Sequence, residues 1–283
     1  MIRIIILSAV LALVVVFTVA KAIAIALRIR RRLAAISAQV YQLEQELRCA
    51  SLQLIQMRGR EIQDDSTGRR LEVRCLSQYG EEPILWALLG YKSKGYYIEV
   101  GAYDGVRLSV SYFFESIGWS GLLVEANPEL YEECRKARPG SKVVNAAVGG
   151  RGASGTIEFS KVVGADGVDA LGFVQASDEH VSKIRQEKGR IETTKVAYTS
   201  LAQLLDQERP ESLDLAVIDV EGIEAVAIEG LELERWTPRV VMVEHNTKGA
   251  KDNYPAAQIL QKHGYRFCTR CKGNDIFISR DVR

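Results

Sequence analysis

The chain has 283 residues, of which 47% are hydrophobic and 26% charged, and this composition excludes a disordered or low-complexity protein. Its 37 basic and 36 acidic side chains give a formal net charge of +1, which argues against a nucleic-acid partner because sequence-independent phosphate binding needs a surplus of clustered Lys and Arg. Five scattered cysteines are too few for a secreted disulfide framework and favour a reducing compartment.

Residues 1–32 predict a transmembrane anchor followed by a basic flank. No charge interrupts Ile4 to Ala20, and the apolar run resumes after Lys21 as far as Leu27. At about 1.5 Å per residue, such a helix would cross a hydrocarbon core about 30 Å thick. Four arginines follow by residue 32, so the positive-inside rule predicts a single-pass membrane protein whose downstream domain lies in the cytoplasm. A cleaved signal peptide is the alternative, because a basic start, an apolar run and small residues near its end imitate the three regions of one.

Residues 33–60 predict a helical stalk. Four heptads are typical of a coiled coil, which makes a homodimer through the stalk the expected assembly. A single amphipathic helix lying on its own domain or on the membrane is the alternative. Residues 61–74 form the expected linker, because residues 63–70 within them have no apolar period. The apolar residues that recur every seven positions are Leu33, Val40, Leu47 and Leu54 in one series and Ile36, Leu43, Ala50 and Met57 in the other.

From residue 75 to residue 283, short apolar runs alternate with helical patterns, which predicts one α/β domain with a parallel sheet covered on both faces. Asn127 and Pro128 are typical of a helix start, and Gly264 is typical of a helix end. The glycine-containing stretch 149–192 has little periodicity apart from one expected strand at 156–159, and long connections of this kind are often lids. The other expected strands are 96–100, 121–125, 142–147, 213–219, 240–244, 265–269 and 275–279, and the expected helices are 108–117, 128–137 and 254–263.

Ligands of an open parallel sheet bind at the carboxyl ends of its strands. The first strand runs into Glu99-Val100-Gly101-Ala102-Tyr103-Asp104-Gly105, whose two glycines flank a tight turn that lets the backbone approach a ligand. Glu125 ends the second strand, where an acid can accept two hydrogen bonds from a ribose diol. Glu99 and Asp104 suit a cationic ligand such as S-adenosylmethionine better than a pyrophosphate. Each also has a structural alternative, Glu99 bonding to backbone amides and Asp104 forming the turn.

Four motifs together carry a resemblance to a known family. They are Ser77-Gln78-Tyr79-Gly80-Glu81-Glu82, Tyr97 to Gly105, Gly118 to Pro128, and Ile218-Asp219-Val220-Glu221-Gly222, and over residues 77–279 the chain resembles the FkbM-type methyltransferases. The resemblance implies a class I (Rossmann-like) fold, a seven-stranded sheet with an antiparallel last strand, S-adenosylmethionine as cofactor, and a hydroxyl of a sugar or other small natural product as acceptor. The positions expected to bind the cofactor are Glu99, Gly101, Ala102, Asp104, Gly105, Glu125, Ala126 and Asp219, with Asn145 and Ala146 near the adenine; Ala126 stands where the family often has proline.

The fourth and fifth strands end in acids and an imidazole, at Asp219 and Glu221 and at Glu244-His245-Asn246. Methyl transfer is an in-line displacement, so the protein must hold the acceptor oxygen and help remove its proton. We expect Asp219 or Glu221 to orient the acceptor hydroxyl and His245 to act as base, because imidazole has the usual pKa nearest neutrality. The structural alternatives are a helix cap for Asp219, an arginine partner for Glu221 and a loop side chain for His245. Asp219, Glu244 and Asn246 loosely resemble the magnesium sites of catechol-type O-methyltransferases, but no metal is predicted.

The expected protein is therefore a membrane-anchored S-adenosylmethionine-dependent methyltransferase that methylates a hydroxyl of a glycan, a lipid-linked sugar or another small natural product. The lipid-linked acceptor follows from the anchor, because a tether raises the effective concentration of an enzyme near membrane-bound acceptors. Two other classes remain open. One is a non-catalytic scaffold that binds a nucleoside or a partner, and the other is an NAD-dependent oxidoreductase, which the missing third glycine of the dinucleotide motif disfavours.

Overall fold

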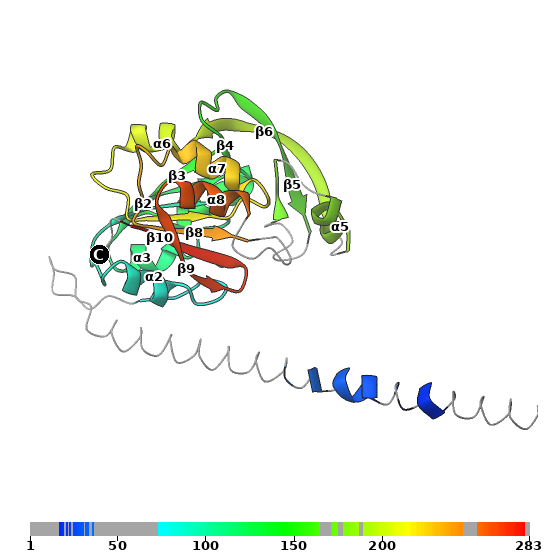
Figure 1. The fold of residues 1–283 in the computed structure, drawn as a ribbon. Coiled ribbons are helices and arrows are strands. Elements are labelled where there is room, and N and C mark those ends of the chain that lie inside the picture. The colour runs from blue at the N-terminus through cyan, green and yellow to red at the C-terminus, as the bar shows by residue number, and fades with distance from the viewer. Residues whose placement is uncertain are drawn as a thin grey trace, which may run out of the picture. The chain divides into compact units, whose positions relative to one another are not determined.

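The structure is a computed structural model. It describes residues 17–19, 21, 23, 25–30, 32, 33, 36, 73–164, 171–174, 178–186, 189–245 and 254–280. The chain divides into two compact units, Met1–Ser51 and Leu52–Arg283. All the described strands belong to the second unit (Figure 1).

In the first unit, the described residues between Phe17 and Ile36 are helical. No helix in the described part of the chain is long and apolar enough to cross a membrane. The described helical positions include the charged residues Lys21, Arg28 and Arg30. This finding contradicts the predicted single-pass anchor and the membrane localisation with a cytoplasmic domain, and we withdraw both. Residues 1–16 of the expected anchor, 37–60 of the expected stalk and 61–72 of the expected linker lie outside the described residues.

The main sheet of the second unit has seven strands in the order β3-β2-β1-β7-β8-β10-β9. β1 pairs in parallel with β2 and β7, β2 with β3, and β7 with β8, whereas β10 is antiparallel to β8 and β9. The predicted α/β fold, with a mixed sheet and an antiparallel last strand, is confirmed. The strands are β1 (Tyr96–Val100), β2 (Ser120–Glu125), β3 (Lys142–Asn145), β7 (Leu215–Ile218), β8 (Val240–Glu244), β9 (Tyr265–Cys271) and β10 (Asn274–Ser279).

Helices cover both faces of the main sheet, because successive residues of each buried strand point to opposite faces. Tyr97 of β1 belongs to a buried cluster with residues of α2 (Glu82–Leu88), α3 (Ser111–Ser116) and α4 (Pro128–Ala137). The next residue, Ile98, belongs to a second cluster with residues of α6 (Leu201–Glu208), α7 (Glu224–Leu231) and α8 (Pro255–Lys262). Figure 1 shows α6, α7 and α8 on the opposite side of the sheet from α2 and α3.

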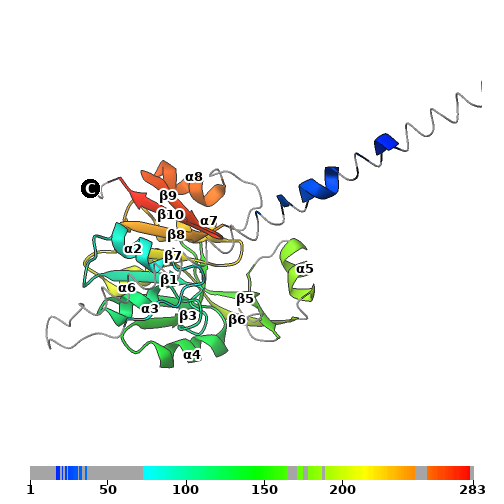
Figure 2. The same ribbon diagram turned by 90° about the horizontal axis from the view of Figure 1, so that it is seen from below.

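A second sheet with the strand order β4-β6-β5 was not predicted as a sheet. Its strands are β4 (Ala147–Gly149), β5 (Thr156–Val163) and β6 (Arg190–Ser200), and α5 (Asp178–Gln186) lies between β5 and β6 in the chain. The expected strand 142–147 is divided, because β3 ends at Asn145 and Ala147 begins β4, which pairs with β6. β6 has mostly exposed or half-buried side chains, so its sequence lacks the apolar alternation that reveals a half-buried strand. β5, β6 and α5 project to one side of the main sheet (Figures 1 and 2).

Candidate functional site

A cavity of about 430 Å³ lies at the carboxyl ends of β1, β2, β7 and β8. The strand order reverses there, between β1 and β7, where open α/β sheets bind their ligands. Of the predicted site residues, Gly101, Glu125, Ala126, Ala146, Asp219 and Glu221 line this main cavity. Glu99 and Ala102, together with Gly101 and Asp219, line a smaller cavity of about 70 Å³. Asp104, Gly105, Asn145 and His245 line neither cavity.

The turn after β1 depends on Gly101, whose φ of +81° suits glycine. A Cβ at this position would lie 1.8 Å from the main-chain oxygen of Asp219, so a side chain would push apart the ends of β1 and β7. The N–H groups of Gly101 and Ala102 both donate to the oxygen of Val124, at 3.0 and 3.2 Å. The turn therefore holds the ends of three neighbouring strands together at the cavity.

Glu125 places a buried carboxyl group at the end of β2, where it is 7% exposed. Its Oε2 accepts a hydrogen bond from the N–H of Tyr103 at 2.8 Å, and its Oε1 accepts one from the N–H of Asn127 at 2.7 Å. Burial raises the pKa of Glu125 to about 7, against the opposing effect of these backbone donors. Each oxygen has further lone-pair capacity, so a ribose diol could still donate to both.

The cavity walls near Glu125 are mostly apolar. Ala126, Leu130 and Ala146 line them from the main sheet and α4, and Phe159 and Phe173 line them from the second sheet and the segment that follows it. Such walls suit a flat heteroaromatic base. Phe159 lies in the one strand expected between residues 149 and 192, but nothing in the sequence indicates that its ring faces the cavity.

Asn145, expected near the adenine, connects β3 to the chain that leaves β2. Its Nδ2 donates to the main-chain oxygens of Glu125 and Ala126, at 2.9 and 3.0 Å. The Asn145 side chain therefore connects β3 to the backbone of Glu125 and Ala126, two residues that line the cavity. The adjacent Ala146 lines the cavity itself.

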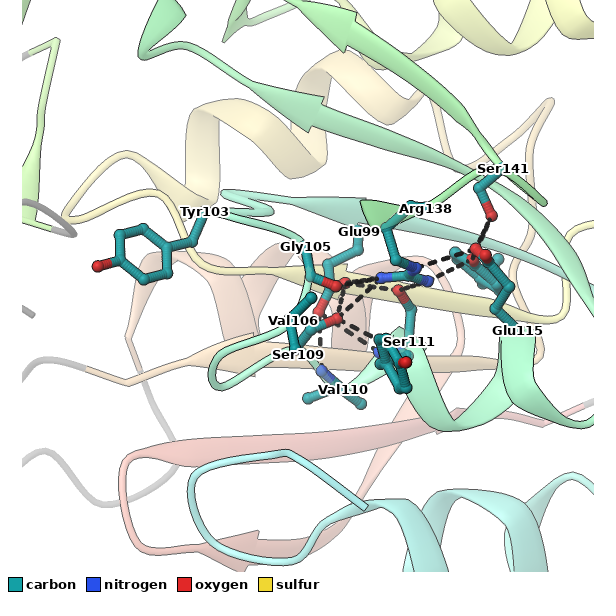
Figure 3. Close-up of polar contacts among 12 residues, drawn as sticks. Glu99, Tyr103, Gly105, Val106, Ser109, Val110, Ser111, Glu115, Arg138 and Ser141 are labelled. Atoms are coloured by element: carbon teal, nitrogen blue, oxygen red, sulfur yellow. Dashed lines mark hydrogen bonds and ion pairs between the residues drawn. The ribbon is translucent and has the colours of Figure 1, made fainter. Parts of the chain in front are cut away.

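Glu99 and Asp104 are both engaged by neighbouring protein groups, and Figure 3 shows the contacts of Glu99. Glu99 is 4% exposed and accepts hydrogen bonds from Ser109 Oγ at 2.8 Å and the Val110 N–H at 3.0 Å, at the start of α3. Asp104 accepts from the N–H and Nε of Arg107, at 2.7 and 2.6 Å. These are the structural alternatives considered from the sequence, and the structure does not bring Asp104 to the cavity that Glu125 lines.

Three acids line the main cavity at the ends of β7 and β8, which the strand order places across β1 from Glu125. Asp219, Glu221 and Glu244 each offer a carboxyl oxygen within 4.8 Å of the others. Asp219 is exposed along the cavity, yet its carboxyl group is surrounded by protein, and this desolvation and then the charge of Glu244 raise its pKa well above the usual value. Three oxygen donors suit a hard cation, but acidic groups of this kind are common without one and we assign no metal. Asn246, the third ligand considered from the sequence, lies outside the described residues.

His245 follows β8 but its side chain packs away from the main cavity. Its N–H donates to the oxygen of Gly273 at 2.6 Å, and its ring contacts the ring of Tyr254 edge to face at 4.4 Å between centroids. Nε2 is buried and has no hydrogen-bond partner among the residues that the structure describes. The role of His245 as a base stays a prediction, and its position gives that role no support.

Comparison with known proteins gives a family match and weak structural likenesses. The chain is similar to a METTL16 MTase domain (13% identity, 76% of this chain and 75% of that one, TM-score 0.44). It is also similar to precorrin-6y C5,15-methyltransferase from Geobacter metallireducens GS-15 (13% identity, 76% of this chain and 94% of that one, TM-score 0.41). A further similar structure is an O-methyltransferase from Bacillus cereus in complex with SAH (14% identity, 74% of this chain and 82% of that one, TM-score 0.36). No curated protein matches the chain. The model of the family described as "Methyltransferase FkbM domain" matches residues 99–267, more than half of the chain, and the protein belongs to this FkbM methyltransferase family.

Proposed function

We propose that the protein is an S-adenosylmethionine-dependent O-methyltransferase whose acceptor is a hydroxyl of a glycan or another small natural product. The observation that carries the proposal is a cavity with two chemically different ends. Glu125 stands among apolar walls at one end, and Asp219, Glu221 and Glu244 stand together at the other. The lipid-linked acceptor considered from the sequence depended on a membrane anchor and is not part of the proposal.

The residues at the first end fit the nucleoside part of the cofactor. Two backbone N–H groups donate to Glu125, and its carboxyl oxygens can accept further hydrogen bonds. The cavity walls beside it are apolar. Gly101 keeps a side chain out of the turn between the two ends. When bound, S-adenosylmethionine supplies a methyl group activated by a sulfonium cation, and the carboxyl groups of this cavity favour that charge over an anionic ligand.

The residues at the acidic end fit an acceptor hydroxyl. An oxygen that gains a methyl group must lose its proton, and a carboxylate can accept that proton and pass it to solvent. Desolvation and the neighbouring charge of Glu244 raise the pKa of Asp219, so this acid binds its proton more tightly than an exposed aspartate does, and in its protonated form it can donate a hydrogen bond to the acceptor oxygen. Asp219 or Glu221 would orient the hydroxyl, and an ionised neighbour in the same group would receive its proton.

Calorimetric titration of the full chain with S-adenosylhomocysteine, with NADH as the matched negative control, tests the first half of the proposal. We expect S-adenosylhomocysteine to bind and NADH not to bind, whereas the reverse would favour an oxidoreductase.

Methyl-labelled S-adenosylmethionine tests the second half of the proposal, the transfer to a hydroxyl. The label should enter a glycan or natural-product fraction as an ether that resists mild base, and Asp219→Asn should slow its transfer. Label recovered as a base-labile ester would contradict O-methylation of a hydroxyl, and binding without any transfer would favour the non-catalytic scaffold.

A further inference from the structure

Arg138 is a completely buried arginine that the proposed mechanism does not use. It follows the last residue of α4, and its side chain is 0% exposed. Burying a guanidinium is costly unless every donor is satisfied, so its partners indicate what it does. Its Nη1 donates to the Gly105 oxygen at 3.0 Å and Ser109 Oγ at 3.1 Å, its Nη2 to Tyr97 Oη at 2.6 Å and Ser111 Oγ at 3.0 Å, and its Nε to Glu115 Oε2 at 2.9 Å.

Two of these contacts hold the loop between β1 and α3 (Figure 3). The Gly105 oxygen belongs to the turn that follows Gly101, and Ser109 closes the loop at its other end. Ser109 Oγ also donates to Glu99 Oε2 at 2.8 Å, so the guanidinium, the loop and the end of β1 form one connected network. Gly101, Tyr103 and Leu108 of the same loop line the main cavity.

Gly105 is shaped to this arginine. Its φ is +79°, and a Cβ there would lie 2.8 Å from Cγ of Arg138 and 2.8 Å from Sγ of Cys134. The sequence suggested that this glycine allows a ligand to approach, but the structure shows that α4 is what approaches it. The path of the loop is therefore fitted to Arg138.

The loop in turn fixes the cavity acid. The N–H of Tyr103 lies two residues before Gly105 and donates to Glu125 Oε2 at 2.8 Å. A shift of the loop would move this donor and change both the orientation and the proton affinity of Glu125.

We propose that Arg138 is a positioning residue that holds residues 101–109 in the conformation that presents Glu125 to the methyl donor. The identity of that donor rests on the proposed function, but the hold on the loop does not. Lysine could supply the charge that Glu99 and Glu115 require, but it could not place donors on the loop, on β1 and on α3 at once, because all its donors sit on a single nitrogen.

The matched pair Ser109→Ala and Ser141→Ala tests the proposal together with Arg138→Lys. Both serine variants delete one hydroxyl from the same network. Ser109 contacts Arg138 on the loop side, whereas Ser141 contacts Glu115 and Tyr97 on the other side. We expect the Kd for S-adenosylhomocysteine to rise about tenfold in Arg138→Lys and about fivefold in Ser109→Ala, and less than about twofold in Ser141→Ala. In turnover, KM for the methyl donor should rise with kcat at saturation nearly unchanged.

Amide hydrogen exchange of the ligand-free chain tests the hold on the loop independently of any ligand. The Gly105 N–H, which donates to the Ala102 oxygen at 2.9 Å, should exchange faster in Arg138→Lys and Ser109→Ala but not in Ser141→Ala. Wild-type Kd and exchange in folded Ser109→Ala would overturn the proposal, and so would an equal loss in both serine variants. If the wild type bound no S-adenosylhomocysteine, the proposed function would fail while the exchange rates still decided whether Arg138 holds the loop.

Discussion

Among the single residues of the cavity, Glu125 should contribute most to the pH dependence of ligand affinity. Burial raises its pKa to about 7, so the ligand-free protein carries a neutral acid below that pH and a carboxylate above it. The carboxylate offers more acceptor capacity to a ribose diol and the charge that a sulfonium prefers. We therefore expect affinity for S-adenosylmethionine, measured by calorimetry, to rise from about pH 6 to about pH 8. Glu125→Gln should bind more weakly and lose this dependence.

Glu132→Gln provides the matched control for Glu125, since it makes the same charge change on the outer surface of α4, where the side chain is 48% exposed. It should keep both the affinity and the pH profile of the wild type. A Glu125→Gln variant with an unchanged profile would assign the pH dependence to another group, and Asp219 would then be the next acid to replace.

Glu82 offers a separate test of stability, because it is buried in α2 away from the main cavity lining. Burial raises its pKa from 4.5 to about 7, and hydrogen bonds from the N–H and Oγ of Ser77 reduce the shift. The folded state therefore binds this proton more tightly than the unfolded chain does. The resulting stabilisation is fully present below pH 4.5 and is lost as pH rises through about 7.

In denaturant unfolding, the free energy of unfolding should therefore fall with rising pH more steeply in the wild type than in Glu82→Gln. Between about pH 4.5 and about pH 8, the wild type should lose about 3 kcal/mol more of its free energy of unfolding than Glu82→Gln does. Parallel pH curves for the two proteins would show that Glu82 ionises normally in the folded state.

At the scale of elements, Gly101, which follows β1, and Gly90, which follows the cap of α2, form a matched pair. Both have positive φ, +81° and +68°, so alanine should cost each of them about 1 kcal/mol of backbone strain. A Cβ at Gly90 meets nothing within 4 Å, whereas one at Gly101 overlaps the Asp219 oxygen. Gly101→Ala should therefore lower the free energy of unfolding by several kcal/mol more than Gly90→Ala and weaken S-adenosylhomocysteine binding, because β1 and β7 must separate at the cavity. Equal losses would mean that the turn relaxes without disturbing the strands.

The elements differ in how far their sequences reveal them. β1, β2 and β7 are buried almost throughout, so their apolar runs identified them, and the Asn127-Pro128 signal placed α4 correctly, with Asn127 Oδ1 accepting from the Glu129 N–H at 3.1 Å. β6 is long, but its side chains are mostly exposed or half-buried and show no apolar alternation. Glu125 was recognisable as an acid at a strand end. Arg138 was not, because a basic residue at the end of a helix is usually a solvated partner of the helix dipole and only the tertiary fold buries it.

At the scale of the whole molecule, the described cavities and their supports all lie in the second unit, Leu52–Arg283. The heptads lie mostly in the first unit and mostly outside the described residues. The oligomeric state of the protein is therefore predicted from the sequence pattern alone. We propose that residues 33–60 pair two copies of the chain. The site needs no residue from a second copy to form its cavity, and binding should therefore be independent of the assembly.

Sedimentation of the full chain should show a dimer, and Leu47→Glu should shift it toward monomer because a carboxylate at a seam position opposes its counterpart in a low-polarity interface. Gln45→Glu adds the same charge two residues earlier, at a position outside both apolar series, and should leave the dimer intact. Calorimetry on both variants should return the wild-type Kd for S-adenosylhomocysteine, because every cavity residue lies between Gln78 and Asn274. A monomeric wild type would favour the single amphipathic helix instead. A dimer that lost affinity on dissociation would show that the second copy supports the cavity.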